Sequence, residues 1–507
     1  MVMKAISDRL WGSRAKLSYL MIASMLVLFT MLGGREIWTQ EHRWADIVSG
    51  MFYRHDFLHP YLGNNNYYDK PLLSYWLIAI IAKLYGGLTA WSLRLPSALA
   101  GLLAIWSTYS LGTTLKNKQL GFLSAWLLLT TFYFVFWART SSADMLNLAG
   151  SVFAVAWYMK KRYQAGYFDY SVFFLIIAVS SLCKGLVGAI VPCIAVLCDV
   201  ALQKSWRQHL RLPLFLSLIP ALIIYLLPFM ASSYMGGGSY SESGLYLVYR
   251  ENILRYFQPF DHQGPIYTYF IYLPVYLLPW TIFFIPALFS LKSRWRTMTT
   301  NQKWIVWTTL SLFVFFTASG SRRSYYVLPL VPFAILLTAD WMLSGTFIKT
   351  MQRLYARMII IFLTLLFLLF GVAQAWYYSQ YGINRFAQEL KQQAEMTMPW
   401  QHWQVVMLDA ESKLNFYLQL PPNANTYDIQ GERVPQSSAQ LAKAWPIVQD
   451  KPEHTIFITR KLYAAALEPF FSGYERVELP AFSAWPFIDA NVNDEPVAFV
   501  PKRSETG

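Results

Sequence analysis

The stretch LSYLMIASMLVLFTMLGGREIWTQEHRWAD, residues 17–46, joins a long apolar run to a cluster of ionisable side chains. The apolar part, near 17–34, is about as long as a bilayer span, and similar runs recur through the first three quarters of the chain. The run follows a basic N-terminus and ends in LGGRE without a small-residue cleavage pattern, which indicates an uncleaved anchor. The sequence therefore predicts an all-α polytopic membrane domain.

The composition divides the chain into two parts. Of its 507 residues, 55% are hydrophobic and 14% are charged, whereas a soluble protein has about 25% charged residues. The net charge is +14, from 42 Lys and Arg against 28 Asp and Glu. Residues 377–507 hold 11 basic and 15 acidic side chains, or −4, which leaves +18 on the membrane part. Basic cytoplasmic loops explain much of this excess but not all of it, and we expect membrane lipids, not nucleic acid, as partners.

The basic residues predict the orientation. Spans are expected near 17–34, 95–115, 119–137, 145–160, 169–183, 186–201, 212–231, 266–288, 303–319, 325–343 and 358–376. With the N-terminus inside, the short basic connections near 116–118, 160–162, 204–211, 292–296 and 349–357 all face the cytoplasm. We expect 11 to 13 transmembrane helices, because the segment 72–85 reads either as a further span or as a helix in the interface.

The tail has a different pattern. VVMLDA (405–410) and TIFITR (455–460) read as buried strands, and SSAQLAKAW (437–445) reads as a helix. This alternation predicts a small α/β domain over 377–507, facing the periplasm, after a membrane domain over 1–376 that includes outer-loop amphipathic helices at about 35–85.

Basic residues also lie on the predicted outer side, where loops should be poor in them. The set comprises Lys70, Arg94, Arg139, Lys184, Arg250, Arg255, Arg322 and Arg323. Single members could be explained by side chains that reach from helix ends to the interface. As a set they indicate an outer cavity for an anion, and the commonest anion in a bilayer is a lipid phosphate.

Three motifs support this interpretation. Lys70 precedes a Pro suited to open a helix in YYDKPLLSYW (67–76). Lys184 lies at a Gly-containing break in LCKGLVG (182–188), where an unpaired ammonium is costly. SGSRRSYY (319–326) places Arg322 and Arg323 beside Tyr325 and Tyr326, and the forked guanidinium suits phosphate.

The first outer loop holds the first carboxylate of interest. A helix over about 37–52 would put Arg43 and Asp46, with His42 and Ser49, on a solvated face. Glu41 projects into the opposite, apolar face. A buried carboxylate is either perturbed for chemistry or paired structurally with one of the outer arginines.

The second carboxylate is Asp144, in SSADMLNLAG (141–150). Ser141 and Asp144 fit an S-x-x-D capping box, which is a structural explanation for the acid. The alternative is that Asp144 and Glu41 serve one site beside a phosphate, as a base for an acceptor and as a partner for a developing oxocarbenium ion.

Several motifs together resemble a known family. They are WTQEHRWADI, YYDKPLLSYW, RLPSALAGLL, FWARTSSADM, CKGL, ENILRYFQPFDHQGP and SRRSYYVLPLVP, in order over roughly residues 15–345. This series is similar to the bacterial branch of the protein O-mannosyltransferase superfamily, in particular to the aminoarabinose transferases of lipid A, which have the GT-C fold. The resemblance implies a glycosyltransferase that takes a sugar from a polyprenyl phosphate carrier on the periplasmic side.

The resemblance also implies roles for residues. Glu41 and Asp144 match two of the family's acidic positions. Lys70 matches the lysine that holds donor phosphate, and Lys184, Arg322 and Arg323 match positions near that phosphate. The family's usual Asp is replaced by Gln40, which cannot accept a proton. One alternative is that Glu41 or Asp144 is the base. The other is that no strong base is needed, because a phosphate acceptor such as that of lipid A is already ionised.

The sequence therefore predicts a multi-pass, inverting transferase of the bacterial inner membrane whose acceptor is lipid A or another glycolipid. Glu41 and Asp144 are the expected catalytic residues, and Lys70, Lys184, Arg255, Arg322 and Arg323 the expected phosphate ligands; Gln40, Arg43, Asp69, Tyr325 and Tyr326 are supporting candidates. Two alternatives stay open: a protein or glycan hydroxyl as acceptor, and a non-enzymatic flippase or binding protein for the lipid-phosphate sugar. The sequence shows no metal-ligand spacing, so we expect catalysis to require no cofactor or divalent metal.

Overall fold

The structure is a computed structural model. It describes residues 2–38, 40–62, 65–67, 70–235, 249–258, 262–344, 347–410, 413–421, 425–427, 439–478 and 495–502. The chain divides into two compact units by its Cα packing. The first comprises residues 1–33, 57–60 and 66–372, and the second comprises 34–56, 61–65 and 373–507.

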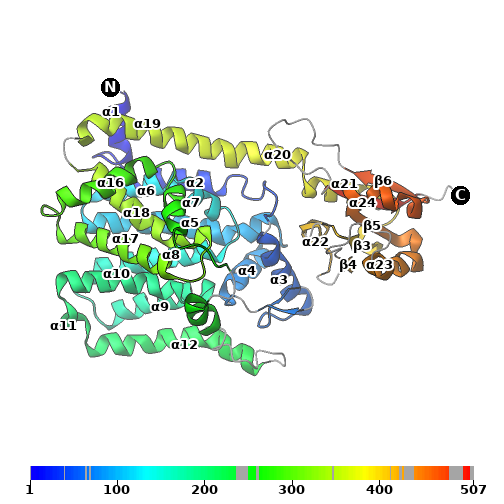
Figure 1. Cartoon of the computed structure of the whole chain (residues 1–507), viewed down its shortest axis with the longest axis horizontal. Coiled ribbons are helices and arrows are strands. Elements are labelled where there is room, and N and C mark those ends of the chain that lie inside the picture. The colour runs from blue at the N-terminus through cyan, green and yellow to red at the C-terminus, as the bar shows by residue number, and fades with distance from the viewer. Residues whose placement is uncertain are drawn as a thin grey trace. The chain divides into compact units, whose positions relative to one another are not determined.

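The first unit is helical. Its N-terminal half contains α1 (Val2–Leu10), α2 (Leu17–Phe29), α4 (Leu73–Tyr85), α5 (Ala90–Leu115), α6 (Lys118–Leu129), α7 (Phe132–Ala138), α8 (Ala143–Lys161), α9 (Tyr167–Lys184), α10 (Val187–Gln203), α11 (Trp206–His209) and α12 (Leu212–Tyr234). The remainder contains the π-helix η1 (Tyr249–Leu254), α14 (Arg255–Phe257), α15 (Thr268–Tyr276), α16 (Thr281–Arg294), α17 (Thr300–Ala318), the 3-10 helix η2 (Ser324–Leu330), α18 (Val331–Met342), α19 (Phe347–Phe367) and the π-helix η3 (Leu368–Ala373). Figure 1 shows α5, α8, α9 and α10 running alongside one another.

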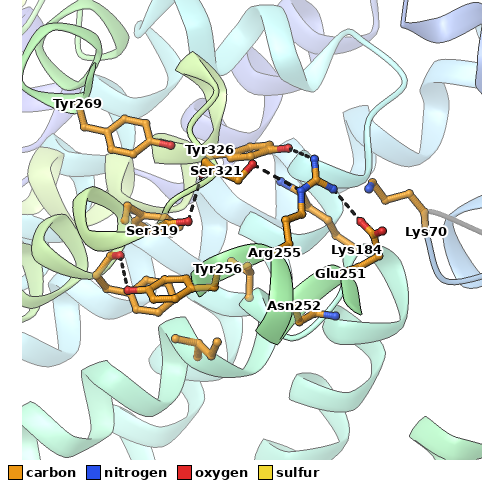
Figure 2. A pocket seen from close by; sticks show the side chains of 14 residues that line it. Lys70, Lys184, Glu251, Asn252, Arg255, Tyr256, Tyr269, Ser319, Ser321 and Tyr326 are labelled. Carbon is orange, nitrogen blue, oxygen red and sulfur yellow. Dashed lines mark hydrogen bonds and ion pairs between the residues drawn. The ribbon is translucent and has the colours of Figure 1, made fainter. Parts of the chain in front are cut away.

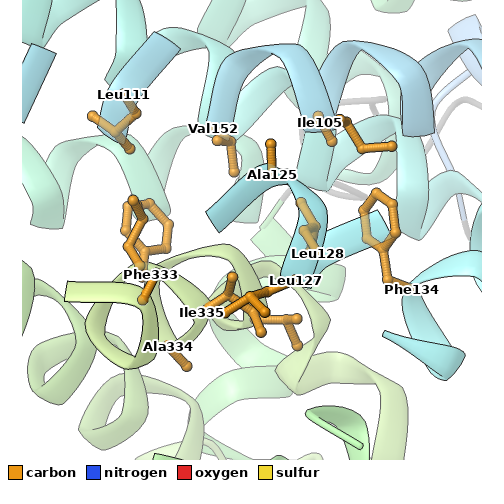
Figure 3. Packing of buried hydrophobic residues seen from close by; sticks show 14 of the residues in the cluster. Ile105, Leu111, Ala125, Leu127, Leu128, Phe134, Val152, Phe333, Ala334 and Ile335 are labelled. Atoms are coloured by element: carbon orange, nitrogen blue, oxygen red, sulfur yellow. The ribbon is translucent and has the colours of Figure 1, made fainter. Parts of the chain in front are cut away.

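The core of this unit lies between α5, α6, α8 and α18. Leu127 and Leu128 of α6 are fully buried, and so are Phe333 and Ile335 of α18 (Figure 3). Because α6 and α18 bury residues on most of their surface, each reads as a continuous apolar run without amphipathic periodicity. The burial of these two helices on all sides explains why their sequences are apolar throughout and have no polar face.

Five helices of the described residues are long and apolar enough to cross a membrane: Ala90–Leu115, Tyr167–Lys184, Leu212–Tyr234, Ser324–Met342 and Met351–Gln380. A sixth is counted if the bent pair α6 and α7 forms one span, and three shorter apolar helices are Leu17–Phe29, Leu73–Tyr85 and Val187–Gln203. The chain is a multi-pass membrane protein, as predicted. The number of 11 to 13 spans stays a prediction.

Two of the predicted spans are each two helices. The span predicted at 119–137 is bent by 71° between α6 and α7. The hydroxyls of Thr130 and Thr131 donate to the carbonyls of Trp126 and Leu127, at 2.7 and 2.8 Å, and such hydroxyl contacts bend helices. The span predicted at 266–288 is interrupted between α15 and α16, near Pro279, which cannot donate a helical hydrogen bond.

Buried carboxylates bind several basic residues of the predicted inner loops. Asp340 lies 2.6 Å from Lys116 and 2.8 Å from Arg294. Asp199, which is 1% exposed, pairs with Arg162. These basic side chains are therefore joined to the helix bundle and not only solvated at its surface.

The second unit contains a five-stranded mixed sheet with the order β4-β3-β5-β7-β6. Its strands are β3 (Gln404–Leu408), β4 (Asn425–Tyr427), β5 (Thr455–Arg460), β6 (Tyr474–Glu478) and β7 (Pro496–Pro501), and a separate two-stranded sheet pairs β1 (Tyr61–Leu62) with β2 (Asn65–Asn66). Strand β3 is parallel to β4 and β5, whereas β7 is antiparallel to β5 and β6. The helices are α3 (Glu41–Arg54), α20 (Gln374–Gln380), α21 (Ile383–Glu395), α22 (Lys413–Leu418), α23 (Ala439–Asp450) and α24 (Lys461–Leu467), with short 3-10 turns at 400–402, 452–454 and 468–471. The α/β character predicted for the tail is confirmed.

Residues 34–56 belong to this second unit. The sequence predicted them as part of the membrane domain over 1–376. The Glu36 carboxylate accepts hydrogen bonds from the backbone N–H groups of Ile383 and Asn384, at the start of α21. The Tyr417 hydroxyl accepts a hydrogen bond from the N–H of Ile37, at 2.8 Å, and α3 packs against α22. These contacts join residues about 350 positions apart, which no local pattern can predict.

Candidate active site

A cavity of about 110 Å³ opens in the first unit, between α9, α10, η1, α17 and η2 (Figure 2). It is lined by Lys70, Lys184, Val187, Ile190, Glu251, Asn252, Arg255, Tyr256, Tyr269, Phe315, Phe316, Ser319, Ser321 and Tyr326. The lining combines charged side chains with apolar ones, Val187, Ile190, Phe315 and Phe316. An amphiphile with an anionic head would find a complement for both of its parts.

Lys184 is placed by the end of α9. The following residue, Gly185, has a φ of +125°, a conformation that side chains other than hydrogen strongly disfavour. The turn leaves the Lys184 ammonium paired with the Asp144 carboxylate and 4.6 Å from the centroid of the Tyr326 ring. Both charged side chains are largely buried, so this pair is shielded from solvent.

Asp144 lies in the first turn of α8, but the predicted capping box is wrong. The N-cap is Ser142, not Ser141, and its hydroxyl accepts the N–H of Asp144 at 3.0 Å. The same hydroxyl lies 2.9 Å from the Asp144 carboxylate. The Asp144 carboxylate thus points toward Lys184. It does not form the predicted capping box with Ser141, three residues earlier.

Arg255 is held by three side chains. Its guanidinium donates to Glu251 at 2.7 Å, to the Tyr326 hydroxyl at 3.3 Å and to the Ser321 hydroxyl at 3.4 Å. Glu251 also accepts a hydrogen bond from Arg250 at 3.0 Å. Figure 2 shows Lys70 on the same side of the cavity as Glu251 and Arg255.

Glu251 and Asn252 are two residues of the cavity that were not among the predicted site residues. Asn252 accepts the N–H of Leu186 at 2.7 Å, and its side chain occupies the space that a Cβ at Gly185 would need. The spacing Glu251–Arg255 within ENILRYF is an i, i+4 pair, a local signal that could have identified the carboxylate. The contact between Asn252 and Leu186 had no such signal.

Cations and carboxylates of the cavity are paired. Lys184 is bound to Asp144, and Arg255 is bound to Glu251, which also accepts a hydrogen bond from Arg250. The carboxylates hold the cations in place before any ligand is bound, so less ordering is needed on binding.

Arg322 and Arg323 do not line this cavity. Arg322 donates to the carbonyls of Thr317 and Gly264, and its own N–H binds the carbonyl of His262. Arg323 donates to the Tyr325 hydroxyl at 2.8 Å. The hydrogen bonds of Arg322 therefore join its own loop to the segments that contain Gly264 and Thr317. Tyr326, four residues further along the chain, lines the cavity.

Glu41 lies in the second unit and is fully buried. Its carboxylate accepts the N–H of Trp38 at 2.7 Å and pairs with Arg35 at 3.2 Å. Gln40 is the residue before α3 and makes no side-chain cap. Glu41 is therefore buried, as the helical periodicity predicted. It also has an arginine partner, Arg35, which was not in the predicted outer set of basic residues.

The face of α3 predicted to be solvated is only partly so. His42, Arg43, Asp46 and Ser49 are half-buried, not exposed. Burial raises the pKa of Asp46 from 3.8 to about 7. The packing of residues 34–56 in the second unit explains why this face is not open to water.

Two other basic residues of the predicted outer set hold main-chain carbonyls. Arg94 is fully buried and donates to Leu32 at 3.0 Å. Arg139 donates to the carbonyls of Val27, Leu28, Thr30, Met31 and Phe370. Arg139 thereby satisfies carbonyls at the end of α2 that have no intrahelical partner. Asp69 lies outside the described residues.

Among the described residues, no group of three or more His, Cys, Asp or Glu side chains is placed to hold a metal ion. The three cysteines are free; Cys183 is buried, Cys198 is half-buried and Cys193 is exposed.

Known proteins share both sequence and fold with this chain. Residues 69–233 match the family model described as dolichyl-phosphate-mannose-protein mannosyltransferase. The undecaprenyl phosphate-alpha-4-amino-4-deoxy-L-arabinose arabinosyl transferase of Shewanella sediminis is 27% identical over 338 residues, 64% of this chain and 60% of that protein. The protein of the same name from Pectobacterium atrosepticum is 26% identical over 67% of this chain and 61% of that protein. The match thus spans about three fifths of the length of these curated relatives.

Solved structures agree on the fold. The crystal structure of ArnT from Cupriavidus metallidurans bound to undecaprenyl phosphate matches with a TM-score of 0.69 and 16% identity, over 95% of this chain and 97% of that one. The apo oligosaccharyltransferase of Archaeoglobus fulgidus matches with a TM-score of 0.53 and 12% identity, over 92% of this chain and 74% of that one. The chain therefore has the GT-C fold, and the predicted resemblance to the protein O-mannosyltransferase superfamily, with aminoarabinose transferases among its similar relatives, is confirmed.

Proposed function

We propose that this protein is a glycosyltransferase of the bacterial inner membrane. It moves a sugar from a polyprenyl phosphate carrier to a glycolipid acceptor of the lipid A type on the periplasmic side. The single observation that carries this proposal is the cavity whose lining joins Lys70, Lys184 and Arg255 to apolar side chains, with Asp144 bound to Lys184. The names of the arabinosyl transferases support the donor and reaction classes.

In this proposal the three cations hold the donor phosphate. Arg255 offers a forked guanidinium that Glu251 and Tyr326 keep oriented. Lys184 supplies a compact charge beside it. The apolar side chains Val187, Ile190 and Phe315 would contact the first isoprene units of the carrier.

The reaction breaks the bond between the sugar's anomeric carbon and the phosphate oxygen. An acceptor oxygen forms a new bond to that carbon from the opposite face, with inversion, and the electron pair of the broken bond leaves on polyprenyl phosphate. The leaving phosphate gains negative charge, which Lys184 and Arg255 stabilise more strongly than the donor's single charge.

The acceptor determines whether a base is needed. A phosphate monoester on a lipid A-type acceptor is already ionised near neutral pH, so its oxygen attacks without losing a proton. This suits a site in which Asp144 is engaged by Lys184 and Ser142 and is not free to take a proton from the acceptor. The role we assign to Asp144 is to fix Lys184 and to balance charge at the anomeric carbon. Glu41, bound to Arg35 and Trp38, keeps the first outer segment ordered.

A transfer assay tests this function. Purified protein in nanodiscs is given a pool of polyprenyl phosphate sugars and, in separate reactions, lipid A, core oligosaccharide or unfolded protein. Mass spectrometry then follows both lipids. We expect a sugar-sized gain on lipid A with release of polyprenyl phosphate, lost in Lys184→Gln and Asp144→Asn and retained in Lys83→Gln, an exposed lysine of α4.

Other results would contradict the proposal in different ways. Transfer only to core oligosaccharide or protein would show a hydroxyl acceptor and refute the lipid A type. Binding of the donor without release of polyprenyl phosphate, whichever acceptor is supplied, would refute the enzyme and favour a flippase or binding protein.

A further inference from the structure

A polar cavity of about 530 Å³ lies in the first unit beside its N-terminal helix α1. Its lining comes from α1 and the turn that follows, from the start of α6 and from α19, and Figure 1 shows α1 lying against α19. The charged and amide side chains of the lining are Lys4, Asp8, Arg14, Gln119 and Gln352. None of these residues lines the candidate active site.

Helix α1 has one face toward the protein and another toward the cavity. Met3, Ile6 and Leu10 pack against the hydrophobic core of the first unit. Lys4 and Asp8 line the cavity, and residues four positions apart lie on the same helix face. The packing of the apolar face therefore keeps the Lys4 side of the helix at the cavity.

The turn after α1 is held by hydrogen bonds. The Asp8 carboxylate accepts the N–H of Ser13 at 2.8 Å and its hydroxyl at 3.0 Å, and it lies 3.6 Å from Arg14. A Cβ at Gly12 would collide with this carboxylate, so the turn requires glycine there. The Trp126 indole of α6 donates to the carbonyl of the last residue of α1 at 2.9 Å. The turn that carries Arg14 is thus formed before any ligand binds, and the Asp8 oxygens are engaged within it.

The cavity has donors from three separate segments. Lys4 and Arg14 are exposed, so their charged groups are accessible from the surrounding solvent. Gln119 of α6 and Gln352 of α19 add neutral amide N–H groups. A phosphodiester has two oxygens that share one negative charge, and ammonium, guanidinium and amide donors all bind such oxygens. The ligand chemistry that this lining suits is therefore a phosphodiester.

The segments around the cavity are strongly basic. Residues 1–19 contain four basic side chains and a single acid, Asp8, and residues 116–119 and 351–357 contain four more basic side chains and no acid. These segments flank or form the connections predicted to face the cytoplasm. The cytoplasmic surface of a bilayer carries anionic phospholipids that attract basic segments. A membrane phospholipid is thus the nearest source of a phosphodiester.

We infer that the cavity between α1, α6 and α19 binds the phosphodiester headgroup of an anionic phospholipid from the inner leaflet. The bound lipid joins the N-terminal helix to two helices of the bundle. A choline headgroup would bring its own cation toward Lys4 and Arg14, so the cavity should prefer a glycerol headgroup. This inference does not depend on the proposed transferase function, and its test measures binding alone.

The test measures lipid binding to the purified full chain by native mass spectrometry. Phosphatidylglycerol and phosphatidylcholine with the same acyl chains are titrated separately, and soluble glycerol 3-phosphate and inorganic phosphate are titrated without lipid. The cavity variant is the double substitution Lys4→Gln and Arg14→Gln. Its matched control is Lys204→Gln with Arg207→Gln, which removes two exposed cations from another connection predicted to face the cytoplasm.

We expect wild type to bind phosphatidylglycerol at least about tenfold more tightly than phosphatidylcholine, because each basic residue at a membrane surface strengthens binding of anionic lipid about fivefold. The cavity variant should lose this preference by about tenfold or more, and the control should keep it. Neither soluble phosphate should bind measurably. Equal thermal unfolding midpoints of the two double variants in detergent would show that the cavity variant is folded.

A second variant tests the cavity without removing any side chain contact of Lys4 or Arg14. Ala5 lies in the lining, and Ala5→Glu adds a carboxylate there that should repel the phosphate and abolish the preference. Ala201→Glu, at an exposed position of α10, adds the same charge elsewhere and should keep the preference. This pair decides the question if the double cavity variant unfolds at a lower temperature.

Four outcomes would overturn the inference. Equal binding of the two lipids by wild type would show that the headgroup is not recognised. An undiminished preference in the folded cavity variants would place the headgroup elsewhere. An equal loss in the control variants would show a general attraction of the basic surface and no site. Binding of soluble phosphate by wild type, lost in the cavity variants, would identify a soluble ligand in place of a lipid.

Discussion

The guanidinium of Arg255 lies 2.7 Å from the carboxylate of Glu251, four residues earlier on the same short helical segment. Both side chains are about one-tenth exposed, so the pair is shielded from water. Glu251 fixes the direction of the guanidinium, and Tyr326 and Ser321 bind its other nitrogens. The cavity therefore presents an oriented fork to a phosphate, not a mobile positive charge.

Arg255→Lys should weaken binding of polyprenyl phosphate about ten- to hundredfold. The variant keeps the charge but cannot make the forked contacts, and a lost charge-assisted hydrogen bond costs about 1.5–3 kcal/mol. The measurement is the equilibrium Kd with radiolabelled polyprenyl phosphate. Arg207→Lys, an exposed arginine on α11, is the control and should bind as wild type does. A Kd for Arg255→Lys that equals that of wild type would show that only the charge matters.

Arg139→Gln should destabilise the first unit by about 2–4 kcal/mol. Arg139 donates to carbonyls of four residues around the end of α2 and to Phe370, and a shorter amide would leave several of these buried acceptors unpaired. Thermal unfolding in detergent, followed by tryptophan fluorescence, measures the loss. Arg323→Gln, at a half-buried position, serves as the control. Equal midpoints for the two variants would contradict the role given to Arg139.

Asp46→Asn should remove a pH dependence of stability. Because burial raises the pKa of Asp46 from 3.8 to about 7, the folded protein holds a proton between these values that the unfolded chain has lost. The stability of the wild type should therefore fall as pH rises from about 4 to 7 and then level off. Unfolding midpoints at pH 5 and pH 8 should differ less in Asp46→Asn than in wild type. Asp450→Asn, at an exposed position, should leave the difference unchanged; an unaltered difference in Asp46→Asn would show that other groups cause it.

Gly382→Ala should loosen residues 34–56. Gly382 has a φ of +110°, and a Cβ there would collide with the Glu36 carboxylate that binds the start of α21. Hydrogen exchange measured by mass spectrometry should show faster exchange over 34–56 and at the start of α21. Gly473→Ala is a matched control in the same unit, because a Cβ at 473 would meet no atom within 4 Å. Unchanged exchange over 34–56 in Gly382→Ala would mean that Glu36 does not anchor this segment.

The helices were the most predictable part of the fold. Apolar length placed α5, α8, α9 and α12 within a few residues, because a bilayer requires long runs without charge. The bend after α6 was not predicted, since it arises from the hydroxyls of Thr130 and Thr131. The sheet of the second unit was indicated by two strands, but its antiparallel partner β7 comes from a segment that no motif marked.

The candidate site was predictable where chemistry is unusual for a membrane. A lysine at a glycine break and a carboxylate at a helix start identified Lys184 and Asp144, and the structure brings these two together. The hydrogen bonds of Arg322 to the carbonyls of Gly264 and Thr317 could not be predicted, because these partners are visible only in three dimensions. Glu251 was overlooked because an acid four residues before an arginine is also common on ordinary helix surfaces.

The hydrogen bond from Leu186 to Asn252 has a consequence for product release. Asn252 adjoins Glu251 and lies three residues before Arg255, while Leu186 lies two residues after Lys184. The segments that carry the two cations are therefore joined by a hydrogen bond from the main-chain N–H of Leu186 to the side-chain oxygen of Asn252, which involves neither cation. A departing polyprenyl phosphate can widen the gap between Lys184 and Arg255 only if this bond breaks or if both segments move together. The rate of product release would then depend on an uncharged amide as well as on the two cations.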